Sequence, residues 1–115
     1  MKDYMFWQSL DLLLESNEII IDRPKHSRHP RYPECIYPLD YGYLKGTMST
    51  DGCGVDVLVG SEIDIGINAI VCIADVVKQE VEIKVLLGCT PDEQEEILAF
   101  HNRYAGMRGL LIRRH

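Results

Sequence analysis

The fold of this chain depends most on residues 36–60, which read IYPLDYGYLKGTMSTDGCGVDVLVG. The tyrosine-rich residues 36–44 are predicted to be extended, residues 45–54 form a loop rich in Gly, Ser and Thr, and residues 55–59 are a buried, valine-rich strand. Asp56 interrupts that strand. Because aspartate is uncommon in strands and an unpaired buried carboxylate is costly, its position predicts a neutralising partner, for which a divalent cation is one candidate.

The segments on either side predict two helices and four further strands. Apolar residues at helical spacing indicate a helix over residues 3–15, and Thr90 with Glu93 forms the capping pattern at the start of a second helix. The expected strands are residues 18–21, 69–74, 81–87 and 110–113. Short connections favour an antiparallel sheet or a small closed barrel with helices packed outside. The predicted class is therefore α+β, mainly β, in a single domain of residues 1–115.

Composition indicates a soluble globular protein. The 115 residues carry a formal net charge of −6, and 46% of them are hydrophobic. The negative charge argues against nucleic acid or an anionic membrane as the main partner, and no apolar run reaches transmembrane length. The four cysteines have no CxxC spacing and the N-terminal residues have no signal-peptide pattern. We therefore expect a cytoplasmic protein with free thiols and no zinc site.

Two groups of charged residues suggest phosphate chemistry. Residues 22–35 combine three prolines with a basic cluster, and arginine binds phosphate oxygens bidentately. Five acids supply the hard oxygen ligands that Mg²⁺ prefers, namely Asp40, Asp51, Asp56, Glu80 and Glu82. Cations, Mg²⁺ and tyrosine hydroxyls together suit phosphoryl transfer to water. Composition alone is a weak signal for this chemistry and favours a solvated basic loop and ordinary acidic turns.

The order and spacing of residues add a more specific signal. Tyr-Pro-Leu-Asp-Tyr-Gly-Tyr at 37–43, followed by Asp-Gly-Cys-Gly-Val-Asp-Val-Leu-Val at 51–59, resembles the signature of the soluble family I inorganic pyrophosphatases. That signature reads Tyr-Pro-x-x-Tyr-Gly-Tyr/Phe, a spacer, then Asp-Gly-Asp-Pro-x-Asp-Val/Ala-x-Val. Arg-Pro-Lys-His-Ser-Arg at 23–28 is similar to the family's Ile-Pro-Lys-Gly-Ser-Arg element. The resemblance covers about residues 18–60, more than a third of the chain.

The resemblance implies both a fold and an activity. The implied fold is a small OB-like, five-stranded, antiparallel or mixed β-barrel with flanking N-terminal and C-terminal helices. The implied activity is Mg²⁺-dependent hydrolysis of inorganic pyrophosphate to two phosphates. Because the family commonly forms homo-oligomers, a homo-oligomer is also implied for this chain.

The resemblance also assigns roles to individual residues. The implied metal ligands are Asp51, Asp56 and Glu82, with Glu80 replacing a further metal-binding aspartate. The implied phosphate ligands are Lys25, Arg28, Arg31, Lys84 and Tyr104. Tyr41 matches a tyrosine that contacts phosphate and orders the site, so Tyr41, Asp51, Asp56 and Cys53 make up the implied catalytic centre.

Cys53 is the main departure from the family pattern. It occupies the position of the motif's middle aspartate, which in the family lies at the nucleophilic water between two metal ions. A thiol is a poor ligand for Mg²⁺ and, with an ordinary pKa of about 8.5, is mostly protonated at neutral pH. The chain also lacks the family's β-hairpin between the first basic loop and the Tyr-Pro element, so a more open pocket is expected.

Three functions remain open at this point. The first is a minimal pyrophosphatase, and the second is a domain that binds metal–phosphate ligands or a partner without turnover. The third is a hydrolase of another small phosphoanhydride that the opened pocket admits. For single residues, surface solubility explains Arg28 and Arg31 equally well, a solvated strand face explains Glu82 and Lys84, and helix packing explains Tyr104.

Overall fold

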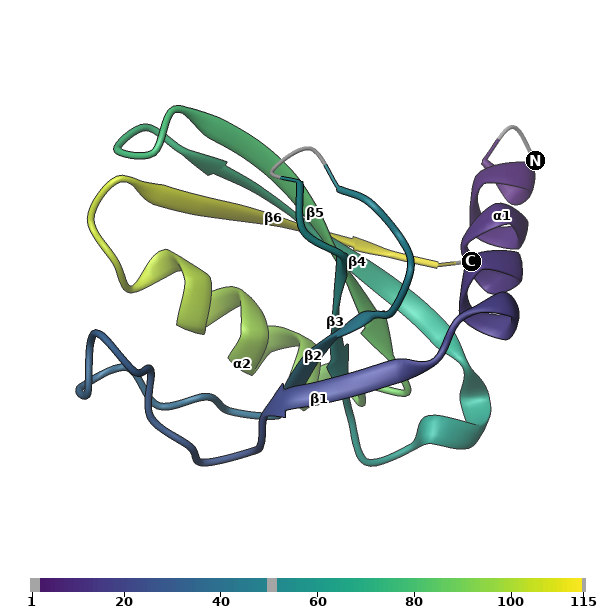
Figure 1. The fold of residues 1–115 in the computed structure, drawn as a ribbon, viewed down its shortest axis with the longest axis horizontal. Helices are drawn as coiled ribbons and strands as arrows, with labels where there is room; N and C mark the ends of the chain where they lie inside the picture. Colours follow the sequence, from purple (N-terminus) through teal and green to yellow (C-terminus); the bar gives the residue numbers. More distant parts are fainter. Residues whose placement is uncertain (1–2, 50–51, 115) are drawn as a thin grey trace.

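The computed structural model describes residues 3–49 and 52–114 and contains two α-helices, one short 3-10 helix and six strands (Figure 1). In chain order these are α1 (Tyr4–Ser16), β1 (Ile19–Arg23), β2 (Asp40–Leu44), β3 (Val55–Val59), η1 (Ile63–Ile65), β4 (Ile67–Asp75), β5 (Glu80–Leu87), α2 (Pro91–Asn102) and β6 (Met107–Arg113). The predicted helices and strands are all present, with ends that differ by a few residues. The α+β, mainly β class is confirmed.

All six strands form one mixed sheet in the order β1-β2-β3-β5-β4-β6. Neighbouring strands are antiparallel except for β3 and β5, which run parallel along Val57–Val59 and Val85–Leu87. The prediction of a five-stranded barrel is wrong. The last strand, β6, pairs with β4 and becomes an outer strand, so β1 and β6 lie at opposite edges of an open sheet in the described part of the chain.

The two helices cover opposite faces of this sheet (Figure 1). Trp7 of α1 packs with Val57 and Val85, whereas Ile97 of α2 packs in a separate cluster with Leu58. Val57 and Leu58 are neighbours in β3 and therefore point to opposite faces. Each fully buried aliphatic side chain contributes about 1.5–3 kcal/mol, so both faces stabilise the fold. No helix within residues 3–49 and 52–114 is long and apolar enough to cross a membrane.

The start of α2 is fixed by its cap. The Thr90 side-chain oxygen accepts a hydrogen bond from the Glu93 backbone N–H at 3.1 Å, and the Glu93 carboxylate accepts one from the Thr90 N–H at 2.8 Å. The predicted capping box is therefore confirmed. The same carboxylate also accepts from the Ser61 N–H at 3.1 Å, which ties the segment after β3 to the first turn of α2.

Gly42 explains part of the Tyr-Gly-Tyr spacing. It pairs with Ile21 across β1 and β2, and a Cβ at this position would lie 1.9 Å from the Ile20 carbonyl oxygen. Glycine therefore allows β1 to approach β2. Since side chains alternate along a strand, Tyr41 and Tyr43 share the opposite face of β2, which is the face covered by α2.

Candidate functional site

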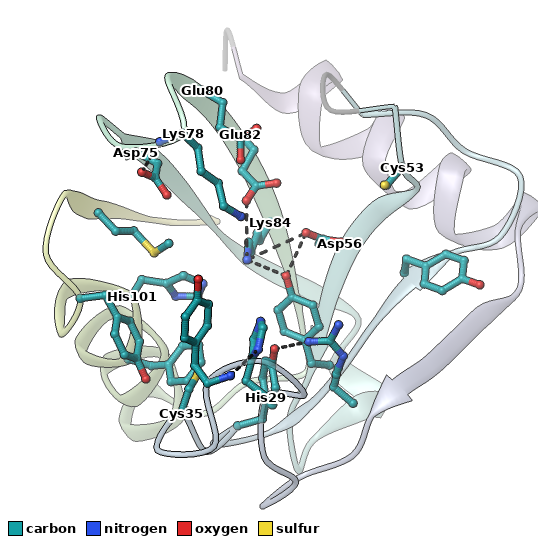
Figure 2. Close-up of a pocket in the computed structure, with 18 of the residues that line it drawn as sticks. His29, Cys35, Cys53, Asp56, Asp75, Lys78, Glu80, Glu82, Lys84 and His101 are labelled. Carbon is teal, nitrogen blue, oxygen red and sulfur yellow. Dashed lines mark hydrogen bonds and ion pairs between the residues drawn. The ribbon is translucent and has the colours of Figure 1, made fainter.

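A cavity of about 710 Å³ lies on the α2 side of the sheet (Figure 2). Its walls come from β2, β3 and β5, from the loop between β1 and β2, from the turn between β4 and β5, and from the end of α2. Tyr41 on β2, Asp56 on β3 and Lys84 on β5 reach it from three strands that are adjacent in the sheet. The alternation of Asp56 with Val57, and of Lys84 with Val85, places both polar side chains on this face.

Lys84 is the centre of a polar network in the cavity. Its Nζ donates a hydrogen bond to the Tyr41 hydroxyl at 2.6 Å, and that hydroxyl donates to Asp56 Oδ2 at 2.9 Å. Lys84 Nζ also lies 3.9 Å from Asp56 Oδ2 and 3.7 Å from Glu82 Oε1, so it sits between two carboxylates (Figure 2). Lys84 is only 8% exposed. In this structure its ammonium group is therefore the partner that neutralises Asp56.

Burial and charge set the protonation states of this network. Burial lowers the pKa of Lys84, while the neighbouring Glu82 and Asp56 carboxylates oppose that shift. Burial also raises the pKa of Tyr41, and the adjacent Asp56 carboxylate raises it further. Tyr41 therefore stays protonated at neutral pH, and its hydroxyl donates a hydrogen bond to Asp56. This hydrogen bond fixes the orientation of the Asp56 carboxylate.

Removal of the Tyr41 hydroxyl tests this network. In Tyr41→Phe, Lys84 loses its closest acceptor and Asp56 loses a donor, so we expect a loss of about 2 kcal/mol in the free energy of unfolding. Urea unfolding followed by circular dichroism measures this change. Tyr43→Phe is the matched control, because Tyr43 lines the same cavity from the same strand and its hydroxyl has no hydrogen-bond partner among the described residues. A loss in Tyr41→Phe no larger than the control's, about 0.5 kcal/mol, contradicts the assignment.

The acids predicted to bind metal are partly brought together. Asp56, Glu82 and Glu80 all line the cavity, and the first two face the same ammonium group, whereas Asp51 lies outside the described residues. No cluster of three or more His, Cys, Asp or Glu in the described ranges is arranged to hold a metal ion. Mg²⁺ is commonly held by one or two carboxylates together with phosphate oxygens and waters. The pair of Asp56 and Glu82 fits that mode of binding.

The residues predicted to bind phosphate fall into two groups. Lys84 and Tyr104 line the cavity, but Lys25, Arg28 and Arg31 are exposed side chains that do not belong to its wall. Arg28 Nη1 instead donates to the Pro33 carbonyl at 2.8 Å. The Tyr104 hydroxyl oxygen is buried, and burial together with the adjacent Cys35 thiol raises the pKa of Tyr104 to about 12. Tyr104 lines the cavity, and its buried hydroxyl has no hydrogen-bond partner among the described residues.

Cys53 lines the cavity and is exposed. It belongs to the loop before β3, close in sequence to Asp56, as the motif spacing requires. The Cys53 side chain is therefore accessible from the cavity. A side chain with hard oxygen ligands at residue 53 would therefore face the same cavity as Asp56 and Glu82.

Many cavity residues were not among the predicted site residues, and three of them are basic side chains or an imidazole that the proposals below use. Arg23 donates a hydrogen bond to the Tyr37 hydroxyl, and its guanidinium carbon lies 5.5 Å from the centre of the Tyr37 ring. Lys78 extends into the cavity from the β4–β5 turn (Figure 2), and its charge adds to the larger effect of burial in lowering the pKa values of His29 and Lys84. His101 of α2 is the third. The basic character of residues 22–35 was visible in the sequence, but not which cation would turn inward.

Comparison with known proteins gives no family assignment. No family model, curated protein or solved structure matches this chain.

Proposed function

We propose that this cavity hydrolyses inorganic pyrophosphate to two phosphates in a Mg²⁺-dependent reaction. The observation that carries the proposal is the meeting of Tyr41, Asp56, Glu82 and Lys84 in one cavity. These residues come from three strands, and each matches a site position in the pyrophosphatase-like motifs of the sequence. Convergence of such residues supports an active site more strongly than their composition does.

Asp56 and Glu82, together with Asp51, would hold Mg²⁺. When bound, the ion neutralises phosphoryl charge and lowers the pKa of a coordinated water. Asp56 is oriented for this by the hydrogen bond from Tyr41 at 2.9 Å. The hydroxyl of Tyr41 and the ammonium group of Lys84 thus hold the Asp56 carboxylate in place before any ligand binds. The entropy of orienting this carboxylate is therefore lost during folding and not during the reaction.

The chain's cations would bind the phosphates. Lys84 presents a buried point charge at the centre of the cavity, while Arg23 and Lys78 add positive charge from the end of β1 and from the β4–β5 turn. In the reaction a water oxygen bonds to one phosphorus, the bond from that phosphorus to the bridging oxygen breaks, and the second phosphate leaves with the bridging oxygen. These cations stabilise the negative charge that develops on the leaving phosphate.

A second function is favoured by one observation. Cys53 faces the cavity at the position where the family motif has an aspartate, and a thiol is a poor ligand for Mg²⁺. A cavity that retains Asp56, Glu82 and Lys84 but not that aspartate can bind a metal–phosphate ligand without turning it over. The alternative is therefore a domain that binds such a ligand and does not hydrolyse it.

One time course by ³¹P nuclear magnetic resonance separates these functions. Pyrophosphate and Mg²⁺ are mixed with the protein, and the pyrophosphate and phosphate signals are followed. Hydrolysis predicts that the pyrophosphate signal disappears as phosphate forms in the two-to-one ratio of the reaction. Binding without turnover predicts a shifted or broadened pyrophosphate signal and no phosphate. An unshifted, undiminished pyrophosphate signal contradicts both functions.

The cation assignment gives a second prediction. Arg23→Gln removes a guanidinium group from the cavity wall, so we expect the KM for pyrophosphate to rise about 10-fold because a charge-assisted contact is lost. Arg28→Gln is the matched control, since Arg28 is exposed outside that wall. Steady-state phosphate release measures both variants. A larger effect of Arg28→Gln than of Arg23→Gln would restore the assignment made from the sequence motif.

A further inference from the structure

We infer that the cavity takes a phosphoanhydride that carries an aromatic organic group, and that a purine nucleoside diphosphate is the simplest ligand of this class. The inference deepens the proposed function, because the diphosphate end is expected to use Lys84, Asp56 and Glu82. Three features of the cavity carry it, namely its size, its aromatic wall and the buried imidazole of His101.

The cavity is much larger than pyrophosphate. Its volume is about 710 Å³. Pyrophosphate occupies on the order of five water volumes of about 30 Å³ each. Cavities of about 300–1,000 Å³ usually hold ligands of several rings or ring-sized groups. The volume therefore leaves room for a nucleoside beside the diphosphate and its hydration shell.

One wall of the cavity is aromatic, and it begins at Tyr41, whose ring centre lies 4.7 Å from Lys84 Nζ. The rings of Tyr37 and Tyr41 have centroids 5.2 Å apart, those of Tyr37 and Phe100 are 5.6 Å apart, and those of Phe100 and Tyr104 are 5.8 Å apart. All four residues line the cavity. Phe100 offers a phosphate oxygen no hydrogen-bond donor, whereas aromatic side chains stack favourably on nucleobases. The charged and aromatic walls thus suit two chemically different halves of one ligand.

His101 supplies a specific polar contact in this aromatic region. It is 1% exposed and lines the cavity on the α2 side (Figure 2). Its Nδ1 lies 2.8 Å from the Ile97 carbonyl oxygen, and since a carbonyl only accepts, Nδ1 carries the proton. Nε2 therefore has a lone pair, and it has no hydrogen-bond partner among the described residues.

A buried acceptor without a partner, such as His101 Nε2, is expected to accept a hydrogen bond from a donor outside the protein. Buried polar atoms are nearly always hydrogen-bonded, so an orphaned one at a cavity wall points to a ligand group. Burial lowers the pKa of His101 to about 4, which keeps the imidazole neutral and its Nε2 an acceptor at neutral pH. Purines supply suitable donors, namely the exocyclic amine of adenine or the ring N–H and amine of guanine.

The reaction on this ligand is a simple hydrolysis. A water oxygen bonds to the terminal phosphorus, the bond from that phosphorus to the bridging oxygen breaks, and the nucleoside monophosphate leaves with the bridging oxygen. One proton from the water passes to solvent. No oxidant, reductant or second substrate is required.

Calorimetric titration of the whole chain tests the inference. Adenosine diphosphate, guanosine diphosphate and pyrophosphate are each titrated in the presence of Mg²⁺, and phosphate release is measured separately on the same samples. We expect at least one nucleoside diphosphate to bind about 10-fold more tightly than pyrophosphate.

Equal or weaker binding of both nucleotides overturns the inference and leaves the proposed function standing if pyrophosphate is hydrolysed. Absence of phosphate release from every compound overturns the proposed function, whereas preferential nucleotide binding still supports the ligand class.

A His101→Phe variant refines this test, because it keeps an aromatic ring and removes the acceptor. We expect the dissociation constant for the nucleoside diphosphate to rise about five-fold or more and that for pyrophosphate to stay within about two-fold. His101→Gln retains an acceptor and should recover part of the nucleotide affinity. Equal weakening of both ligands in His101→Phe contradicts the assigned contact. If His101→Phe does not fold, the comparison of ligands on the unmodified chain decides the inference by itself.

Discussion

Replacing Lys84 with methionine is expected to lower the rate of pyrophosphate hydrolysis about 100-fold or more, because the site loses the preorganised positive charge that faces the phosphates. Methionine keeps the apolar stem of the lysine in its buried position. Without the ammonium group, Asp56 and Glu82 lose the cation that lies 3.9 Å from Asp56 Oδ2 and 3.7 Å from Glu82 Oε1. The variant therefore tests both the chemistry and the electrostatics of the cavity.

The same variant should be less stable. Removing one partner of a buried ion pair costs about 3–5 kcal/mol, and we expect the lower end because the Asp56 and Glu82 side chains retain partial contact with solvent. Urea unfolding gives the stability and steady-state phosphate release gives the rate. Lys45→Met is the matched control, since Lys45 is exposed and its change should stay within about 0.5 kcal/mol. A Lys84→Met protein that equals Lys45→Met in both measurements contradicts the central role of Lys84.

Replacing Cys53 with aspartate is expected to raise the rate of pyrophosphate hydrolysis about 10-fold or more. Cys53 faces the cavity, and a carboxylate there supplies hard oxygen ligands beside Asp56. If the unmodified chain binds its ligand without turnover, Cys53→Asp should create measurable activity. We expect the higher rate because oxygen ligands hold Mg²⁺ and its bound water more strongly than sulfur does.

Cys53→Ser is the control for this prediction. It replaces the thiol by a neutral hydroxyl of similar size, so it changes polarity without adding a carboxylate. Initial rates of phosphate release at saturating Mg²⁺ compare the three proteins. If Cys53→Asp is no faster than Cys53→Ser, residue 53 does not limit the reaction, and the resemblance to the aspartate motif has no catalytic meaning at this position.

Local sequence signals predicted the helices and strands well. The capping pair Thr90 and Glu93 marks the start of α2, and the alternation along Val81–Val85 marks β5, because both signals act within a few residues. The open sheet was not predictable in this way, and the predicted five-stranded barrel was wrong. Closure depends on which strands pair over long distances, and β6 pairs with β4 rather than with β1. Nothing in the sequence of Met107–Arg113 specifies that partner.

Those residues of the candidate site that belong to strands could be predicted from the sequence. Tyr41, Asp56, Glu82 and Lys84 occupy regular strands, so their spacing fixes the face to which they point. Arg28 belongs to an irregular loop, where no periodicity gives side-chain direction, whereas Arg23 ends β1 and lines the cavity. His101 follows Ile97 by one helical turn, which is a signal that would have placed it on the inward face of α2.

The central claim is that the cavity around Lys84 and Asp56 hydrolyses pyrophosphate with Mg²⁺. The most direct test is the initial rate of phosphate release from pyrophosphate, measured for the unmodified chain and for Asp56→Ala, each with Mg²⁺ and with a chelator. We expect release by the unmodified chain only when Mg²⁺ is present, and none above background from Asp56→Ala. A rate for the unmodified chain with Mg²⁺ that equals the rate of Asp56→Ala would contradict the claim.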